Sequence, residues 1–223
     1  MYIAPSGVNI NFYALYRNAD DSKEEFMEKT IKRSAHTKRL VLLALLSAIV
    51  AVLAYYGGFV KIGGLASISL TLIPVVIGAT LCGPLAGAWL GAVAGAIFFA
   101  TPDAAFWFGL SIPGTIITVM VKGALSGLCA GLVYQPLKRF NRYLAAVVSA
   151  IVCPVVNTGI FLLGSLIFFM DAVSGGAAAE GLSVGMYLII FFVGLNFVFE
   201  LITNIVVSPA IVRILDVANK EKK

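Results

Sequence analysis

The sequence predicts an all-α membrane protein with six transmembrane helices and with both its N- and C-termini on the cytoplasmic side. Of the 223 residues, 60% are hydrophobic and only 12% are charged, and the mean hydropathy is +0.98. A soluble domain carries about a quarter charged residues. The apolar residues form long uncharged runs, which are typical of chains that are solvated by lipid. The charges lie at the ends of these runs, so the net charge of +5 indicates membrane flanks rather than a nucleic-acid surface.

Glycines, prolines and charges separate the six apolar runs. The predicted helices span residues 40–60, 68–81, 85–100, 114–134, 143–170 and 184–209, and the last continues amphipathically to residue 215. Pro74 lies inside the short second run, which predicts a kinked or shallow helix. The segment 101–113 is rich in aromatic residues and is predicted to be an interfacial loop. The segment 173–181, with the sequence VSGGAAAEG, is predicted to be a flexible loop.

Lys and Arg residues set the predicted orientation. They precede the first run, occupy the connection after the fourth run and follow the sixth run. With six spans all three basic segments fall on one side, which is therefore cytoplasmic, whereas five or seven spans would separate them. We expect a polar cytoplasmic segment over residues 1–38, a transmembrane domain over 39–215 and a basic tail over 216–223. Because Met27 resembles a natural translation start, residues 1–26 are either an upstream extension or a short amphipathic or disordered tail.

Several classes of chemistry lack their motifs. Cys82, Cys129 and Cys153 lie in apolar runs without a C-x-x-C spacing, and the single histidine, His36, lies before the first span. The sequence therefore predicts no metal site, no disulfide framework and no histidine-dependent catalysis. No P-loop motif occurs, so we expect no ATP hydrolysis by this chain itself. We also expect no catalytic residues and no cofactor.

Small residues recur every four positions in three of the predicted helices. Residues four apart share a helix face, so glycines at this spacing let two backbones approach closely. We expect the third and fourth helices to pack against each other through the following glycines: Gly83, Gly87, Gly91, Gly95, Gly123, Gly127 and Gly131. Ala44 and Ala48 on the first helix serve either internal packing or a flat face on which a partner helix docks.

Two ionisable residues lie within predicted spans, where each costs about 3 kcal/mol at the bilayer centre. They are Lys122 in the fourth helix and Glu200 in the sixth. Such groups must face protein, water or a ligand rather than lipid. Polar residues lie at similar depths on the fifth and sixth helices: Asn157, Thr158 and Asn196.

These polar residues have two compatible interpretations. In the first, Lys122 and Glu200 form a buried ion pair with amide neighbours. In the second, a solute pocket lies between the fourth, fifth and sixth helices, where Lys122 attracts an anionic group. Asn157 and Asn196 then hydrogen-bond the solute, and two aromatic residues of the outer segment cover the pocket: Phe106 and Trp107.

The stretch ISLTLIPVVIGATLCGPLAGAWLGAVAGAIFF resembles the substrate-binding subunits, called S components, of energy-coupling factor (ECF) transporters. The resemblance lies in an I-P pair inside a short second helix, followed by G-A-x-x-x-G-P-x-x-G-x-x-x-G. It continues in PVVNTGIF on the fifth helix and in LNFVFELITNIVVSPAIVRIL on the sixth, and it covers about residues 27–215. Six helices with cytoplasmic termini also fit this family.

The resemblance implies a multi-pass protein of a bacterial plasma membrane that binds a vitamin near the outer face. It implies docking through Ala44 and Ala48 onto a transmembrane coupling (T) subunit, which carries two ATP-hydrolysing subunits. A single buried cation, Lys122, suits a carboxylate, which makes pantothenate the first choice among pantothenate, folate, riboflavin and cobalamin. Glu200 leaves a cationic or zwitterionic solute open. The alternative function is a non-transporting membrane scaffold or a membrane enzyme of unknown chemistry. A scaffold would not need polar residues directed into one cavity.

Overall fold

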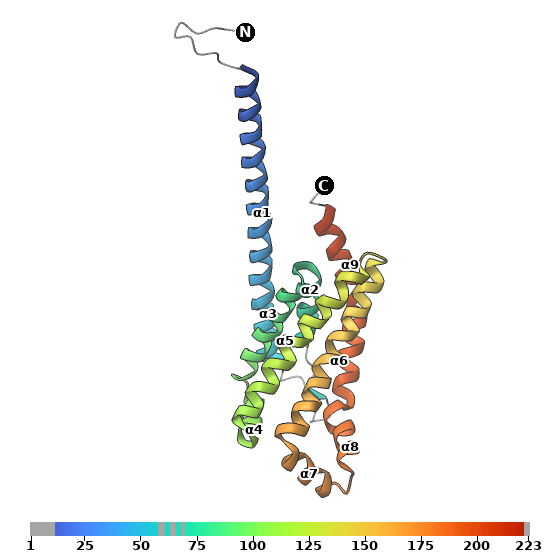
Figure 1. Ribbon diagram of the computed structural model, residues 1–223. Coiled ribbons are helices and arrows are strands. Elements are labelled where there is room, and N and C mark those ends of the chain that lie inside the picture. The colour runs from blue at the N-terminus through green and yellow to red at the C-terminus, as the bar shows by residue number, and fades with distance from the viewer. Residues whose placement is uncertain (1–11, 58–60, 63–65, 68–69, 221–223) are drawn as a thin grey trace. The chain divides into compact units, whose positions relative to one another are not determined.

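The computed structural model describes residues 12–57, 61–62, 66–67 and 70–220, although some side chains within these ranges lie outside the description (Figure 1). Over these residues the chain is α-helical, apart from one antiparallel pair of two-residue strands, β1 (Lys61–Ile62) and β2 (Ala66–Ser67). The α-helices are α1 (Phe12–Gly57), α2 (Leu72–Cys82), α3 (Pro84–Phe98), α4 (Pro102–Leu110), α5 (Ile112–Leu137), α6 (Arg142–Phe168), α7 (Met170–Ala179), α8 (Val184–Tyr187) and α9 (Gly194–Lys220). A π-helical segment, Leu188–Val193, connects α8 to α9.

The long apolar helices confirm the class of an all-helical membrane protein. Within the described residues, three helices are long and apolar enough to span a membrane: His36–Tyr56, Ile112–Leu137 and Arg142–Phe168. Two bent pairs raise the number to five if each pair forms one span: α3 with α4, bent by 85°, and α7 with Val184–Ile190, bent by 95°. Six spans with cytoplasmic termini therefore stay a prediction.

The chain divides into two compact units, Met1–Leu42 and Leu43–Lys223. In the first unit the described residues, from Phe12 onward, are helical. In the second unit α6 packs against α5 and α9, and α2 contacts α3, α5, α6 and α9. α4, α7 and α8 lie at one end of α5 and α6, opposite the turn that joins these two helices (Figure 1).

The expected loop over residues 101–113 is wrong, because Pro102–Leu110 forms α4. Pro102 occupies the first turn, where the N–H that proline lacks would have no partner within the helix. Asp103 lies in the same turn, where its negative charge interacts favourably with the positive end of the helix dipole. The extended backbone of Ser111 ends α4, and its hydroxyl accepts a hydrogen bond from Gly114 N at the start of α5. The two prolines of the segment therefore begin helices instead of excluding them.

The expected flexible loop over residues 173–181 is also wrong, because most of it belongs to α7. Its three alanines are the strongest helix formers, and Asp171 lies in the first turn. The helix ends in a Schellman motif, in which Gly181 has a φ of +67° and Leu182 N donates to Ala177 O at 2.8 Å.

The sixth predicted helix is not continuous. The chain forms α8, passes through the π-helical segment and starts α9 at Gly194, whose φ is +25°. Glycine tolerates this backbone conformation, which side chains with a Cβ rarely adopt. The break lies inside an apolar run that hydropathy alone predicts to be one continuous helix.

α3 and α5 lie in backbone contact along the glycine stripes. A Cβ added at Gly91 would collide with the Gly123 carbonyl, and one added at Gly87 would collide with the Gly127 carbonyl. Further along the same pair of helices, Gly131 lies against Pro84, and a Cβ at Gly95 would lie 3.1 Å from Val119 O. This close approach sets the distance and register between α3 and α5.

Candidate functional site

Lys122 lies on α5 between two aromatic rings from neighbouring helices. It is ten residues past Ile112, which is about 15 Å along the helix. Its Nζ lies 4.6 Å from the centroid of the Phe161 ring on α6 and 5.9 Å from that of Phe98 at the end of α3. A cation near an aromatic face gains about 0.5–2 kcal/mol, more as water is excluded. The half-buried ammonium is therefore held by ring faces.

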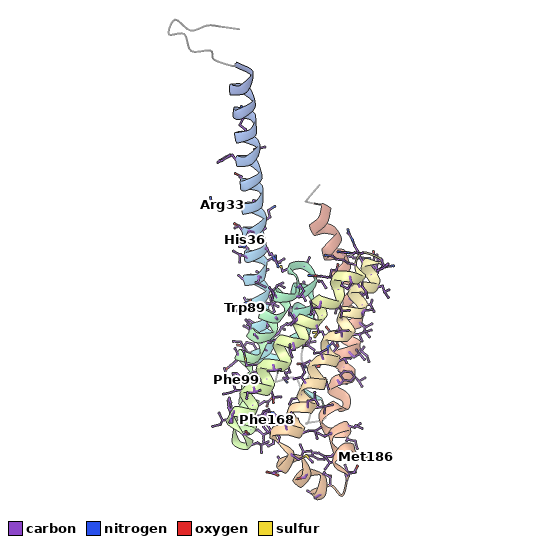
Figure 2. The ribbon with its side chains drawn as sticks, in the orientation of Figure 1. Arg33, His36, Trp89, Phe99, Phe168 and Met186 are labelled. Carbon is purple, nitrogen blue, oxygen red and sulfur yellow. The ribbon has the colours of Figure 1, made fainter. Side chains whose placement is uncertain are left out.

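Trp107 of α4 extends these rings into an aromatic cluster, which consists of Phe98, Trp107, Phe161 and Phe169. The Trp107 ring lies 5.3 Å from Phe161 and 5.3 Å from Phe169, both in edge contacts. Phe169 is buried and packs with Val173 of α7 and with Leu188. Thr115 Oγ1 lies 2.8 Å from Trp107 O, which ties α4 to α5. Figure 2 shows Phe99 and Phe168, which adjoin this cluster at the ends of α3 and α6.

Glu200 supplies the acidic side of the site from α9. Its side chain is buried, with 3% of its surface exposed, and its charge acts on Lys122. The same charge acts on Cys153 of α6, whose thiol lies beside the Ser126 hydroxyl of α5. These three helices, α5, α6 and α9, thus contribute an ammonium, a thiol and a carboxylate to this region of the domain.

A buried polar stripe continues along α9 beyond Glu200. Asn204 and Ser208 follow at intervals of four residues, and each is 1% exposed. The Asn204 side chain donates from Nδ2 to Glu200 O at 2.8 Å. Its Oδ1 and the Thr118 Oγ1 are buried oxygens that make no hydrogen bond within the described part of the chain. Thr118 lies one turn before Lys122 on α5, so it offers a second polar group on the same face.

The structure brings together some of the predicted site residues but not all of them. Lys122, Glu200 and Trp107 belong to the arrangement described above, whereas the Phe106 ring is 66% exposed and makes an edge contact with Trp107. Asn157 and Thr158 are half-buried on α6, and Asn157 lies one turn before Phe161. The Asn196 side chain lies outside the described residues. Sequence reasoning missed four residues of this arrangement: Phe98, Thr118, Phe161 and Phe169. Thr118 and Phe161 lie one turn from Lys122 and Asn157, respectively, which the sequence did indicate.

The segment of α1 from Leu43 onward has two different sides. Val50 is fully buried, and the Ser47 hydroxyl accepts a hydrogen bond from Trp89 Nε1 of α3 at 3.3 Å (Figure 2). Ala44 and Ala48 are exposed. The two alanines therefore lie on a surface that is accessible within this chain, while other residues of α1 pack against α3.

Comparison with known proteins identifies the family. The family model for the ECF transporter, substrate-specific component, matches residues 38–214, which include α5, α6 and the Lys122 and Glu200 positions. No curated protein and no solved structure matches the chain significantly. The match confirms the resemblance that the glycine, proline and asparagine motifs indicated. The chain therefore belongs to the family of substrate-specific components of ECF transporters, which are membrane-embedded specificity subunits rather than enzymes.

Proposed function

We propose that this chain is the substrate-binding subunit of an ATP-driven importer in a bacterial plasma membrane. It spans the membrane six times with both termini in the cytoplasm, and it binds a small water-soluble vitamin that carries a carboxylate. The observation that carries this proposal is the position of Lys122, whose ammonium lies between the Phe98 and Phe161 rings and within the field of Glu200. A charged group at this depth is costly, and a ligand carboxylate would complete its interactions.

The groups around Lys122 favour a particular kind of vitamin. Its ammonium binds a carboxylate, the rings of the aromatic cluster contact an apolar part of the ligand, and the Thr118 hydroxyl and the Asn157 amide offer hydrogen bonds. Pantothenate combines one carboxylate with an amide and two hydroxyl groups, so it is our first choice. Folate, riboflavin and cobalamin are the alternatives within the same proposal, and a zwitterionic vitamin would add a contact to Glu200.

Energy for uptake comes from partners. We propose that Ala44 and Ala48 dock onto a transmembrane coupling subunit, which carries two ATP-hydrolysing subunits. Both alanines are exposed, and small residues let two helices approach closely in a membrane. Membership of the ECF family supports this assembly.

Mass spectrometry of the ligand that copurifies with the detergent-solubilised protein tests the substrate directly. Isothermal titration of that ligand then tests the site. We expect Lys122→Met to weaken binding by about ten- to a hundredfold, because a charged hydrogen bond contributes about 1.5–3 kcal/mol. The fold should survive, since methionine has a similar length and removes a buried charge.

Glu200→Gln is the matched control. If Lys122 and Glu200 serve only as a structural ion pair, removal of either charge leaves the other buried and uncompensated, and both variants misfold. A well-folded Lys122→Met protein with wild-type affinity would exclude Lys122 from the site.

A further inference from the structure

The turn between α5 and α6 combines three exposed cations with an outward-pointing aromatic ring. Phe140 is 90% exposed, the highest value among the large hydrophobic side chains that the structure describes. Lys138 and Arg139 precede it, Arg142 follows it, and all three are exposed. Basic residues beside an exposed apolar ring are the combination found in segments that lie in the membrane interface.

The turn is ordered rather than loose. Lys138 N donates to Tyr134 O at 3.0 Å, and Asn141 N donates to Leu137 O at 3.1 Å. Asn141 caps α6, because its Oδ1 accepts hydrogen bonds from Tyr143 N at 2.8 Å and from Leu144 N at 3.2 Å. The Phe140 ring is therefore held away from the protein by a fixed backbone.

The lengths of the two flanking helices place this turn at the membrane surface. α5 has 26 residues and α6 has 27, so each is about 40 Å long. The hydrocarbon core is about 30 Å thick, which leaves only a few ångströms of each helix beyond it at either end. The turn consequently lies in the headgroup layer, where the apolar residues of interfacial segments, phenylalanine among them, are buried at the boundary with the acyl chains. Tyr143 and Leu144, the first residues of α6 after Arg142, are also more than half exposed.

We propose that this turn is a binding site for anionic phospholipids. Lys138, Arg139 and Arg142 bind the headgroup phosphates, and the Phe140 ring inserts among the first carbons of the acyl chains. Arginine is suited to this role because its guanidinium donates two parallel hydrogen bonds to a phosphate. A protein or nucleic-acid partner is less suited, because the membrane-spanning helices hold the turn where lipid headgroups are the nearest anions.

Fluorescence of a Phe140→Trp variant tests the insertion. The protein is placed in lipid nanodiscs that contain phosphatidylglycerol, and the spectrum of the parent, with Trp89 and Trp107, is subtracted. We expect brominated acyl chains to quench the added tryptophan and aqueous iodide to leave it unchanged. Leu132→Trp is the control for a lipid-facing position, because Leu132 is 52% exposed and lies deeper on α5. Quenching of Phe140→Trp by iodide, without quenching by brominated lipid, would overturn the proposal.

The charges are tested by native mass spectrometry of lipids retained from a mixture of phosphatidylcholine and phosphatidylglycerol. Each basic residue near an anionic surface strengthens binding by about fivefold, so replacing all three with glutamine should reduce the preference for phosphatidylglycerol by about a hundredfold. Lys138→Arg keeps the charge and should keep the preference. Retained thermal stability shows that the triple variant is folded.

Three results would contradict a lipid site. The first is an unchanged lipid preference in the folded triple variant. The second is efficient competition by soluble glycerol phosphate, which would identify a free phosphate compound as the ligand. The third is protection of the Phe140→Trp side chain from both quenchers in the assembled transporter but not in the isolated chain, which would identify a protein partner.

Discussion

The backbone contact between α3 and α5 leads to a sharp prediction for the Gly91→Ala substitution. In a helix that has free space, alanine stabilises relative to glycine by about 1 kcal/mol. At Gly91 the new methyl group would collide with the Gly123 carbonyl oxygen and crowd Ala124 N, which lies 3.2 Å from the Cβ position. Both obstacles are backbone atoms, so no rotamer change relieves the overlap. Only separation of the two helices can restore an ordinary carbon–oxygen contact of about 3.3–3.6 Å.

Overpacking of this kind costs about 1–3 kcal/mol. Gly159→Ala is the matched control, because Gly159 lies inside α6 and no atom of a neighbouring element lies within 4 Å of its Cβ position. Gly159→Ala should therefore be neutral or stabilising by up to about 1 kcal/mol. The two variants should differ in unfolding free energy by roughly 1–4 kcal/mol, which corresponds to a difference in Tm on the order of 10 °C for a chain of this size.

Thermal unfolding in one detergent, measured on both variants beside the parent, checks the difference. We expect the Tm of Gly91→Ala to fall and that of Gly159→Ala to stay level or rise. If Gly91→Ala is as stable as the parent, or if both variants shift equally, α3 and α5 do not meet through their backbones at this position, and the reasoning fails.

Three further predictions concern the partners and the N-terminal segment. Ala48→Trp should leave ligand binding intact and abolish assembly and transport, because a bulky side chain holds two helices apart. Copurification of the coupling subunit checks this prediction. Normal assembly of the variant would exclude this surface as the docking face. A chain that starts at Met27 should insert and bind ligand normally, because it keeps the basic residues that flank the first span; a truncated protein that has lost binding would assign residues 1–26 a role. Proteoliposomes that hold this chain alone, with ATP inside, should bind the vitamin without accumulating it until the coupling and ATP-hydrolysing subunits are added. Strong ATP-independent accumulation by this chain would contradict the proposal that partner subunits supply the energy for uptake.

Hydropathy, together with the charged and proline residues that end apolar runs, predicted the two long central helices well. The predicted ranges 114–134 and 143–170 differ from α5 and α6 by no more than three residues at any end, because charges and prolines bracket apolar runs there. The sequence did not predict α4 and α7. The aromatic residues of the 101–113 segment indicated an interfacial loop, although Pro102 suits the first turn of a helix, and the small residues of the 173–181 segment indicated a flexible loop, although its alanines favour a helix.

The polar part of the site was easier to predict than its aromatic part. Lys122 and Glu200 stand out in any membrane span because burial of a charge is costly, and Glu200 is buried in the structure. Phe98 and Phe161 do not stand out, because phenylalanines are common in lipid-facing helices. Their proximity to Lys122 depends on the register between α3, α5 and α6, which hydrophobic periodicity does not specify.

The glycine contact has a consequence for the precision of the binding site. Gly123 adjoins Lys122 on α5, and Gly91 lies two helical turns before Phe98 on α3. Glycine has no side chain to order, so joining the helices at these points loses no rotamer entropy. Contacts between peptide groups therefore set the position of the Phe98 ring relative to the Lys122 ammonium. The contact at Gly91 lies about 10 Å along α3 from Phe98. The glycine contact therefore fixes the separation of the two helices beside the ligand. Substitutions on the other faces of α3 and α5 can accumulate without changing that separation.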